Sequence, residues 1–374
     1  MGDRCVLFPG RLDPEPSQGV SRRRALQAAL ALLAAGSLPA RAQQKRVPIA
    51  DMHSHYGMIT RRIANSGLAQ DMRSHGICLV AWKLVADARW IRVTNAGIEQ
   101  AGEPAPGDLA RFFEPGFARM KAYVEEQKLR LVLRRADVDA CLAGDSGIVL
   151  ASEGADFLEG RVENLDAAYE NGLRHLQLVH YIHTPVGDFQ TAAPVHNGLS
   201  DMGKRLIEAC NAKGVLVDLA HCSAQAVDQA LDVAKSPVLW SHSWVEGDGG
   251  SWQDPYGYLK RRLSLAQAKK IAARGGVVGL WAFGLQRPGS GWSVGRGDTK
   301  AYARELAKLV DAIGPDHVGI GTDIEGVGPN WAVNDYGHVR SVVDALQDMK
   351  LDSSVVERVA YLNYARVLKE ALKA

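Results

Sequence analysis

The chain has 374 residues, a formal net charge of +2 and 23% charged residues, so no strongly basic field indicates nucleic acid as a partner. Hydrophobic residues make up 47% of the sequence, a share typical of globular enzymes rather than of disordered chains. The length exceeds that of an ordinary domain but suits one barrel of alternating strands and helices.

The N-terminal segment is predicted to be an export signal and not part of the fold. Three consecutive arginines, beginning at Arg22, precede a charge-free apolar run from Ala25 to Ala35 that is too short to span a bilayer comfortably. Ala40-Arg41-Ala42 then supplies a small-x-small cleavage pattern. Ser21 and the arginines resemble a twin-arginine export signal, which is favoured over a membrane anchor or a buried helix.

These features predict a division of the chain into two parts. Residues 1–42 are expected to be an N-terminal extension with a twin-arginine-type signal peptide, and residues 43–374 a single catalytic domain. The mature chain is then expected to be periplasmic or exported, with no stable membrane span.

Four cysteines remain in the expected mature chain, and none belongs to a Cys-x-x-Cys pair. They are Cys78, Cys141, Cys210 and Cys222. Export permits disulfides, but spacing alone does not pair these residues. Cys78 lies in the apolar run 76-GICLVAW-82 and is expected to be a buried free thiol.

Eight apolar, strand-like runs follow one another along the rest of the chain. They are residues 47–53, 77–82, 147–153, 173–180, 215–221, 237–242, 276–280 and 317–323. Segments with helical spacing lie between them, for example 199–214, 222–235 and 299–314. Alternating strands and helices predict an α/β fold, a (β/α)8 TIM-type barrel.

Two longer segments interrupt this alternation. Residues 87–125 are long and mixed, and extra helices are expected there. The Gly-rich segment 283–298 is expected to be a loop, and is interpreted as a lid over a site.

Side chains that bind metals well stand at the ends of most of the predicted strands. His53 and His55 are two residues apart, and residues at that spacing in a strand point to the same side. The other strand ends carry Glu153, His180, His221, His242 and Asp323. Each alone is explained equally well as a cap or a core-edge residue. Because the carboxyl ends of barrel strands meet at one face, we expect the seven to form one site.

The ligand types predict which ion this site takes and what chemistry follows. Imidazoles and carboxylates without a thiolate set suit Zn²⁺ or a similar divalent ion with an open coordination position. Seven such groups exceed the needs of one catalytic ion, so two metals bridged by one carboxylate are expected. Such a pair generates hydroxide near neutral pH and polarises a carbonyl, which favours amide hydrolysis. Asp323 is expected to move the proton from the water to the leaving amine.

From about Val47 onward, the sequence resembles the membrane (renal) dipeptidase family of the amidohydrolase superfamily. The most specific stretches are 179-VHYIHTPVGD-188, 196-HNGLSDMGKRLIEACNAKGVLVDLAHCS-223, 240-WSHS-243 and 317-HVGIGTDIEGV-327. The resemblance implies zinc-dependent hydrolysis of the peptide bond of dipeptides or related small amides, and two Zn²⁺ ions per chain. It also implies a homodimer as a candidate assembly.

The resemblance implies a metal-binding role for five residues. His53 and the residue two positions later would bind one metal, and His221 and His242 would bind the second, with Glu153 bridging the two ions. The family has Asp at the position of His55. Imidazole still ligates Zn²⁺ well, but the first metal is then held by one negative charge fewer.

Three further residues receive roles from the resemblance. His180 would stabilise the developing negative charge on the scissile carbonyl oxygen, and Asp323 would act as acid and base. Arg262 would grip the substrate carboxylate, for which an arginine fork is geometrically suited. Leu263 follows Arg262 where the family usually has Asn, which leaves Arg261 as a possible substitute.

A second departure concerns the strand-four motif, which reads 180-HYIHTP-185 here. Tyr181 and His183 stand where the family usually has two asparagines, so substrate contacts near the carbonyl are expected to differ. Two alternatives to a dipeptidase stay open. One is a mononuclear, deaminase-like amidohydrolase, although 221-HCSAQAV-227 lacks the acidic residue usual in that class. The other is a non-catalytic periplasmic maturation or binding factor with the same fold.

Overall fold

The computed structural model describes residues 46–57, 67–94, 97–245, 258–282, 286–287, 292–293, 298–326 and 332–374. Val47–Ala374 forms one compact unit. The extension and signal peptide predicted over residues 1–42 lie outside the described residues. Within the described part of the chain, no helix combines the length and the apolar character needed to cross a membrane.

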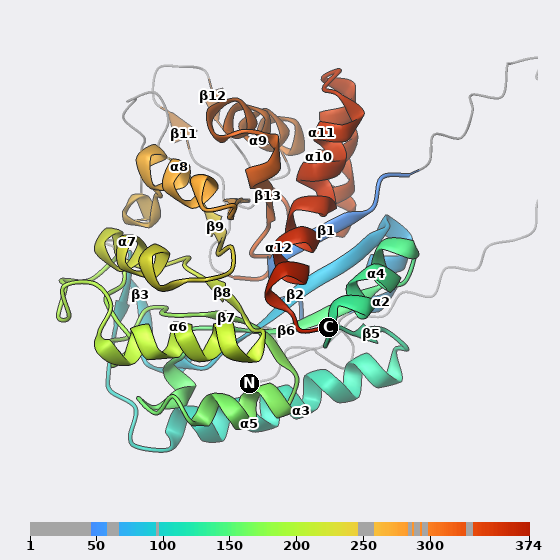
Figure 1. Ribbon diagram of the computed structural model, residues 1–374. Coiled ribbons are helices and arrows are strands. Elements are labelled where there is room, and N and C mark those ends of the chain that lie inside the picture. The colour runs from blue at the N-terminus through green and yellow to red at the C-terminus, as the bar shows by residue number, and fades with distance from the viewer. Residues whose placement is uncertain are drawn as a thin grey trace, which may run out of the picture. The chain divides into compact units, whose positions relative to one another are not determined.

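Eight parallel strands form a barrel, which confirms the predicted (β/α)8 fold (Figure 1). In spatial order they are β1 (Ile49–Ser54), β2 (Ile77–Val85), β6 (Gly147–Glu153), β7 (Leu173–Gln177), β8 (Leu216–Asp218), β9 (Leu239–Ser243), β10 (Val277–Trp281) and β13 (Val318–Gly321). A short ninth strand, β5 (Arg130–Leu131), pairs with the start of β6.

Hydrogen bonds just beyond β13 close the barrel onto β1. The Asp323 amide donates to the His53 carbonyl at 2.8 Å, and the His55 amide donates to the Ile324 carbonyl at 2.9 Å. Buried Asp51 reinforces this seam, since its carboxylate accepts from the Thr322 hydroxyl at 2.6 Å. Two residues that the sequence places at strand ends, His53 and Asp323, are thereby held at adjacent positions.

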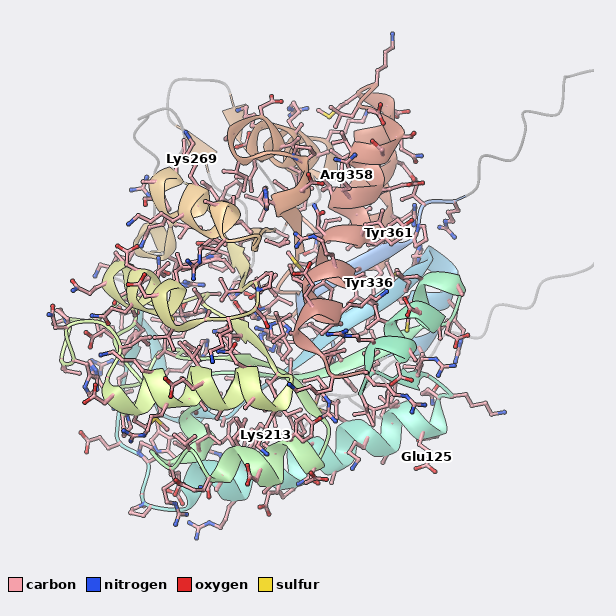
Figure 2. All side chains as sticks on the ribbon, in the orientation of Figure 1. Glu125, Lys213, Lys269, Tyr336, Arg358 and Tyr361 are labelled. Atoms are coloured by element: carbon pink, nitrogen blue, oxygen red, sulfur yellow. The ribbon has the colours of Figure 1, made fainter. Side chains whose placement is uncertain are left out.

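Helices surround the strands (Figure 1). They are α2 (Leu68–His75), α3 (Asp108–Glu126), α4 (Arg135–Ala143), α5 (Asn164–Glu170), α6 (Asp201–Lys213), α7 (Ala224–Val233), α8 (Leu265–Ala273), α9 (Thr299–Ile313), α10 (Tyr336–Asp348), α11 (Ser353–Glu357) and α12 (Asn363–Ala371). Side-chain caps start several of them: the Ser200, Ser223 and Ser264 hydroxyls each accept from the amide three residues later. Tyr336, labelled in Figure 2, begins α10, and its hydroxyl donates to Asp51 at 3.3 Å.

Helix α12 covers the N-terminal mouth of the barrel. Its side chains Tyr364 and Leu368 share one core cluster with residues from the beginnings of the strands, such as Leu216, Leu239 and Val277. Because this end is filled with apolar side chains, the C-terminal ends of the strands are left for a polar site.

The described residues between Asp87 and Glu125 are only partly helical. The expected extra helix is present as α3, but it is preceded by a β-hairpin of β3 (Ile91–Thr94) and β4 (Gly97–Gln100) that we did not predict. The alternation in Ile91-Arg92-Val93-Thr94 is too short to stand out in sequence. All four cysteines considered above are buried and free, as expected for Cys78.

The predicted lid, residues 283–298, lies mostly outside the described residues. Within it, β11 (Gln286–Arg287) and β12 (Trp292–Ser293) pair antiparallel. Its role as a lid stays a prediction.

Two glycines of the barrel allow close backbone packing beneath the polar end. A Cβ atom at either Gly279 of β10 or Gly321 of β13 would overlap the carbonyl oxygen of Ser241 in β9. Only glycine therefore lets these strands approach the residue that precedes His242.

Substitution of Gly321 with Ala is expected to destabilise the barrel, because the new methyl group meets backbone and not a flexible side chain. We expect the free energy of unfolding to fall by about 1–3 kcal/mol, measured by urea denaturation. Gly102→Ala is the matched control, since its Cβ would make only an ordinary contact with Trp90 at 3.6 Å. Equal stability of the two variants would contradict the packing argument.

Candidate metal centre

The structure brings together the seven side chains that the sequence places at strand ends, and all are buried. They are His53, His55, Glu153, His180, His221, His242 and Asp323. The strands β7 and β8 end earlier than predicted, at Gln177 and Asp218, so His180 and His221 lie in the loops that follow.

The first half of the centre consists of His53, His55, Glu153 and Asp323. The two Nε2 atoms of the histidines lie 3.1 Å apart. Glu153 Oε2 lies 2.9 Å from His55 Nε2 and 3.4 Å from His53 Nε2. Asp323 Oδ1 lies 3.2 Å and 3.5 Å from the same two nitrogens. These ligand atoms converge closely enough to hold one metal ion.

The second half consists of Glu153, His221 and His242. The other carboxylate oxygen of Glu153, Oε1, lies 3.1 Å from His221 Nε2 and 3.6 Å from His242 Nε2. The two imidazole nitrogens are 3.3 Å apart. Glu153 therefore offers one oxygen to each half, which is the geometry of a bridging ligand.

Hydrogen bonds behind the ligands orient three of the four imidazoles. The Ser241 hydroxyl lies 2.9 Å from His53 Nδ1 and 3.0 Å from His242 Nδ1. His55 Nδ1 lies 3.0 Å from the carbonyl oxygen of Lys83. A carbonyl only accepts, so His55 carries its proton on Nδ1 and directs Nε2 to the site.

Burial and charge set the protonation of these groups. Burial lowers the pKa of His53, His221 and His242 well below 6.5, which keeps them neutral, the form that binds metal. Burial opposes a charge on His55 as well, but Asp323 and Glu153 raise its pKa to about 10. The carboxylates of Glu153 and Asp323 thus favour a positive charge in the first half, which a bound metal ion would supply.

Two of the site residues adopt a backbone conformation that non-glycine residues rarely take. His221 has φ 72° and Asp323 has φ 55°. Such strain persists only where the surrounding structure holds it, and it is concentrated at functional sites. Here the seam with β1 holds Asp323 in place.

His180 has an acidic partner that sequence reasoning missed. Its Nδ1 lies 2.8 Å from Asp87 Oδ1, and its Nε2 lies 3.5 Å from Glu153 Oε2. Asp87 follows β2 in a short 3-10 turn (Asp87–Arg89). Asp87 comes just after an apolar, strand-like run, and the site histidines were predicted from the same kind of position.

A buried polar network beneath Glu153 was also missed. The Lys83 ammonium forms an ion pair with Asp218 and donates to Gln177 at 2.9 Å. Gln177 in turn donates to Glu153 Oε1 at 3.3 Å. A lysine inside the apolar run of β2 was the available clue, because unpaired charges are rarely buried.

The structure places Arg261, rather than the predicted substrate arginine Arg262, beside the centre. Arg261, only 1% exposed, lies at the second half, with Nη2 3.0 Å from His242 Nε2. Arg262 instead lines a separate surface cavity of about 470 Å³ together with Lys260 and Gln267. The arginines lie at the end of a 3-10 turn (Tyr258–Arg261), where a shift of one residue changes which side chain points inward.

A comparison with protein families identifies the class of this chain. A model of the membrane dipeptidase family (peptidase family M19) matches residues 116–374, more than half of the sequence. The chain therefore belongs to this family, as its sequence resemblance implied.

Individual relatives agree with that assignment. The chain is 26% identical to dipeptidase tcpJ of Claviceps purpurea over 236 residues, which cover 61% of this chain and 52% of that protein. Several of the curated matches span about half of the relative's length.

Solved structures share the fold. A metallo peptidase from Rhodobacter sphaeroides, liganded with a phosphinate mimic of the dipeptide L-Ala-D-Ala, has a TM-score of 0.67 and 19% identity over 87% of this chain and 100% of that one. The probable dipeptidase PvdM from Pseudomonas aeruginosa has a TM-score of 0.69 and 18% identity over 94% and 99%.

Replacement of Ser241 with Ala is expected to weaken metal binding, because one hydroxyl orients a histidine from each half. We expect about a 10- to 100-fold loss of zinc affinity, measured by competition with a chromophoric chelator. Ser341→Ala, on the exposed side of α10, is the control. An affinity equal to that of the control would exclude the orienting role.

A pH dependence of stability is expected from Asp156, whose carboxylate is buried. Burial, and then the charge of Asp87, raises its pKa from 3.8 to about 8. The folded chain thus keeps a proton that the unfolded chain releases, so stability falls as pH rises from about 4 to about 8. Urea unfolding across this range should show a smaller fall for Asp156→Asn than for wild type. The exposed control Asp232→Asn should follow wild type, and parallel curves for all three would contradict the assignment.

Proposed function

We propose that this protein is a zinc-dependent dipeptidase that hydrolyses the peptide bond of dipeptides or closely related small amides, with two Zn²⁺ ions per chain. The observation that carries the proposal is the position of Glu153, with one carboxylate oxygen on each of two histidine pairs. The family, and the dipeptide mimic bound by a relative with the same fold, support the substrate class.

The donor set fits the proposed metal. Imidazole nitrogens are borderline ligands that suit Zn²⁺, and carboxylate oxygens complete many zinc sites. Asp323 Oδ1 is buried and points at the two histidines of the first half, 3.2 Å from His55 Nε2 and 3.5 Å from His53 Nε2. When bound, the metal ions would supply an activated water and polarise the scissile carbonyl.

Asp323 is the proposed acid and base. The Trp281 indole donates to its Oδ2 at 3.0 Å, which leaves Oδ1 directed at the first half. Burial raises the pKa of Asp323 above its usual range, against the opposing effect of His55. A carboxyl group with a raised pKa is suited to take a proton from the attacking water and pass it to the leaving amine.

His180 and Arg261 are proposed to bind two different groups of the substrate. His180 would bind the carbonyl of the scissile bond, and Arg261 would bind the carboxylate. The Asp87 carboxylate fixes His180 through Nδ1, so that Nε2 can donate to the carbonyl oxygen on which negative charge develops. Arg261, and not Arg262, is the arginine positioned to meet a substrate carboxylate at the site.

Export to the periplasm and assembly as a homodimer are retained as parts of this proposal. The twin-arginine-like segment motivates the first. The family resemblance alone motivates the second.

The proposal is tested with the purified chain by elemental analysis and by release of amino acids from a panel of dipeptides with L- or D-residues at the C-terminal position. Turnover that a chelator abolishes and Zn²⁺ restores would support it. A chain that holds its full zinc content and cleaves none of the dipeptides would overturn it. Glu153→Gln is expected to lose both metal and turnover, since its carboxylate faces both halves.

Asp323→Asn is expected to lower kcat by about 10²- to 10⁴-fold, the usual size of a general acid–base contribution, while zinc content stays at the wild-type level. Steady-state kinetics and elemental analysis on the same preparation check both points. A zinc content that falls in step with kcat would show that Asp323 acts as a metal ligand instead.

A further inference from the structure

The two halves of the centre are unequally equipped to hold a metal ion. Both halves share the carboxylate of Glu153. In the first half, both imidazoles have a hydrogen-bond partner on Nδ1. In the second half, among the described residues, His221 Nδ1 has no hydrogen-bond partner. Loss of such an orienting contact typically weakens metal binding.

A cation of the chain itself lies on the second half. Arg261 Nη2 is 3.0 Å from His242 Nε2, while His242 Nδ1 is 3.0 Å from the Ser241 hydroxyl. A guanidinium group donates hydrogen bonds and accepts none. His242 Nε2 must therefore accept with its lone pair, which is the same lone pair that would ligate a metal ion.

Several contacts hold Arg261 in this position. Its Nη1 donates to the Gln190 side chain, and its guanidinium carbon lies 5.8 Å from the centre of the Trp281 ring. The Ser243 hydroxyl donates to its backbone carbonyl. These contacts fix the Arg261 side chain beside His242. Its permanent positive charge repels a divalent cation bound at His242 Nε2.

We infer that Arg261 competes with the second metal ion for His242 Nε2, so that the first half binds metal before the second. An anion that binds the Arg261 guanidinium and draws it away from His242 leaves His242 Nε2 free to bind the metal ion. A carboxylate is the matching anion, because it pairs with an arginine fork through two hydrogen bonds. Carboxylate binding and second-metal binding then favour each other reciprocally. This inference rests on the proposed metal-dependent function.

The experiment is a calorimetric titration of the metal-stripped chain with Zn²⁺, with and without propionate as the carboxylate probe. Wild type is expected to bind zinc in a tight first step and a weaker second step, and propionate is expected to tighten only the second step. In Arg261→Gln, the second step should be tighter by about 5- to 150-fold, the usual range of such coupling, and insensitive to propionate.

Two further variants make the result decisive. Arg261→Met removes the charge but keeps an aliphatic side chain against Trp281, and it replaces the glutamine variant if that chain does not fold. Arg262→Gln removes the neighbouring charge outside the centre and should titrate as wild type does. Two equal steps in wild type, or an unchanged second step in the Arg261 variants, would overturn the inference. Failure of every variant to bind zinc would instead overturn the proposed function.

Discussion

A carboxylate buried among five imidazoles is the interaction on which the rest of this site depends. Glu153 stands at the end of β6, and its oxygens lie within 3.6 Å of a nitrogen from each of the five histidines of the centre. Removal of a carboxylate from water costs several kcal/mol unless opposite charge or hydrogen bonds compensate it. Burial opposes ionisation of Glu153, but the charge of His180 and hydrogen bonds from His221 and His53 hold its pKa well below its usual range. The strands that carry the histidines must therefore be in register for this charge to be tolerated.

The barrel keeps that register through contacts beneath the centre. Ser241 joins the scaffold to the site: its hydroxyl meets a histidine from each half, its amide donates to buried Asp218 at 3.0 Å, and its carbonyl occupies space left by Gly279 and Gly321. The Lys83–Asp218 ion pair lies in the same layer. Because the pair is neutral overall, it adds no net charge beneath the site, where the sequence resemblance implies that His55 stands in place of a carboxylate.

Much of this arrangement could be predicted from the sequence, because strand periodicity and the topology of parallel barrels fix which residues share an end. The eight strands and the seven convergent side chains followed from those two rules. The choice between Arg261 and Arg262 did not, since it depends on the phase of one short turn that periodicity does not determine. Asp87, Lys83 and Asp218 were missed for another reason: the position of each gives at most a local clue, and the partner that defines its role is distant in sequence. The β3–β4 hairpin was too short to give a clear alternating pattern.

The most direct test of the central claim is anomalous diffraction at the zinc edge from crystals grown with Zn²⁺. The proposed arrangement predicts a strong peak among His53, His55, Glu153 and Asp323, and a second, weaker peak among Glu153, His221 and His242, with the Glu153 carboxylate between them. Zinc bound elsewhere on the chain, or a centre in which Glu153 contacts no metal, would contradict it.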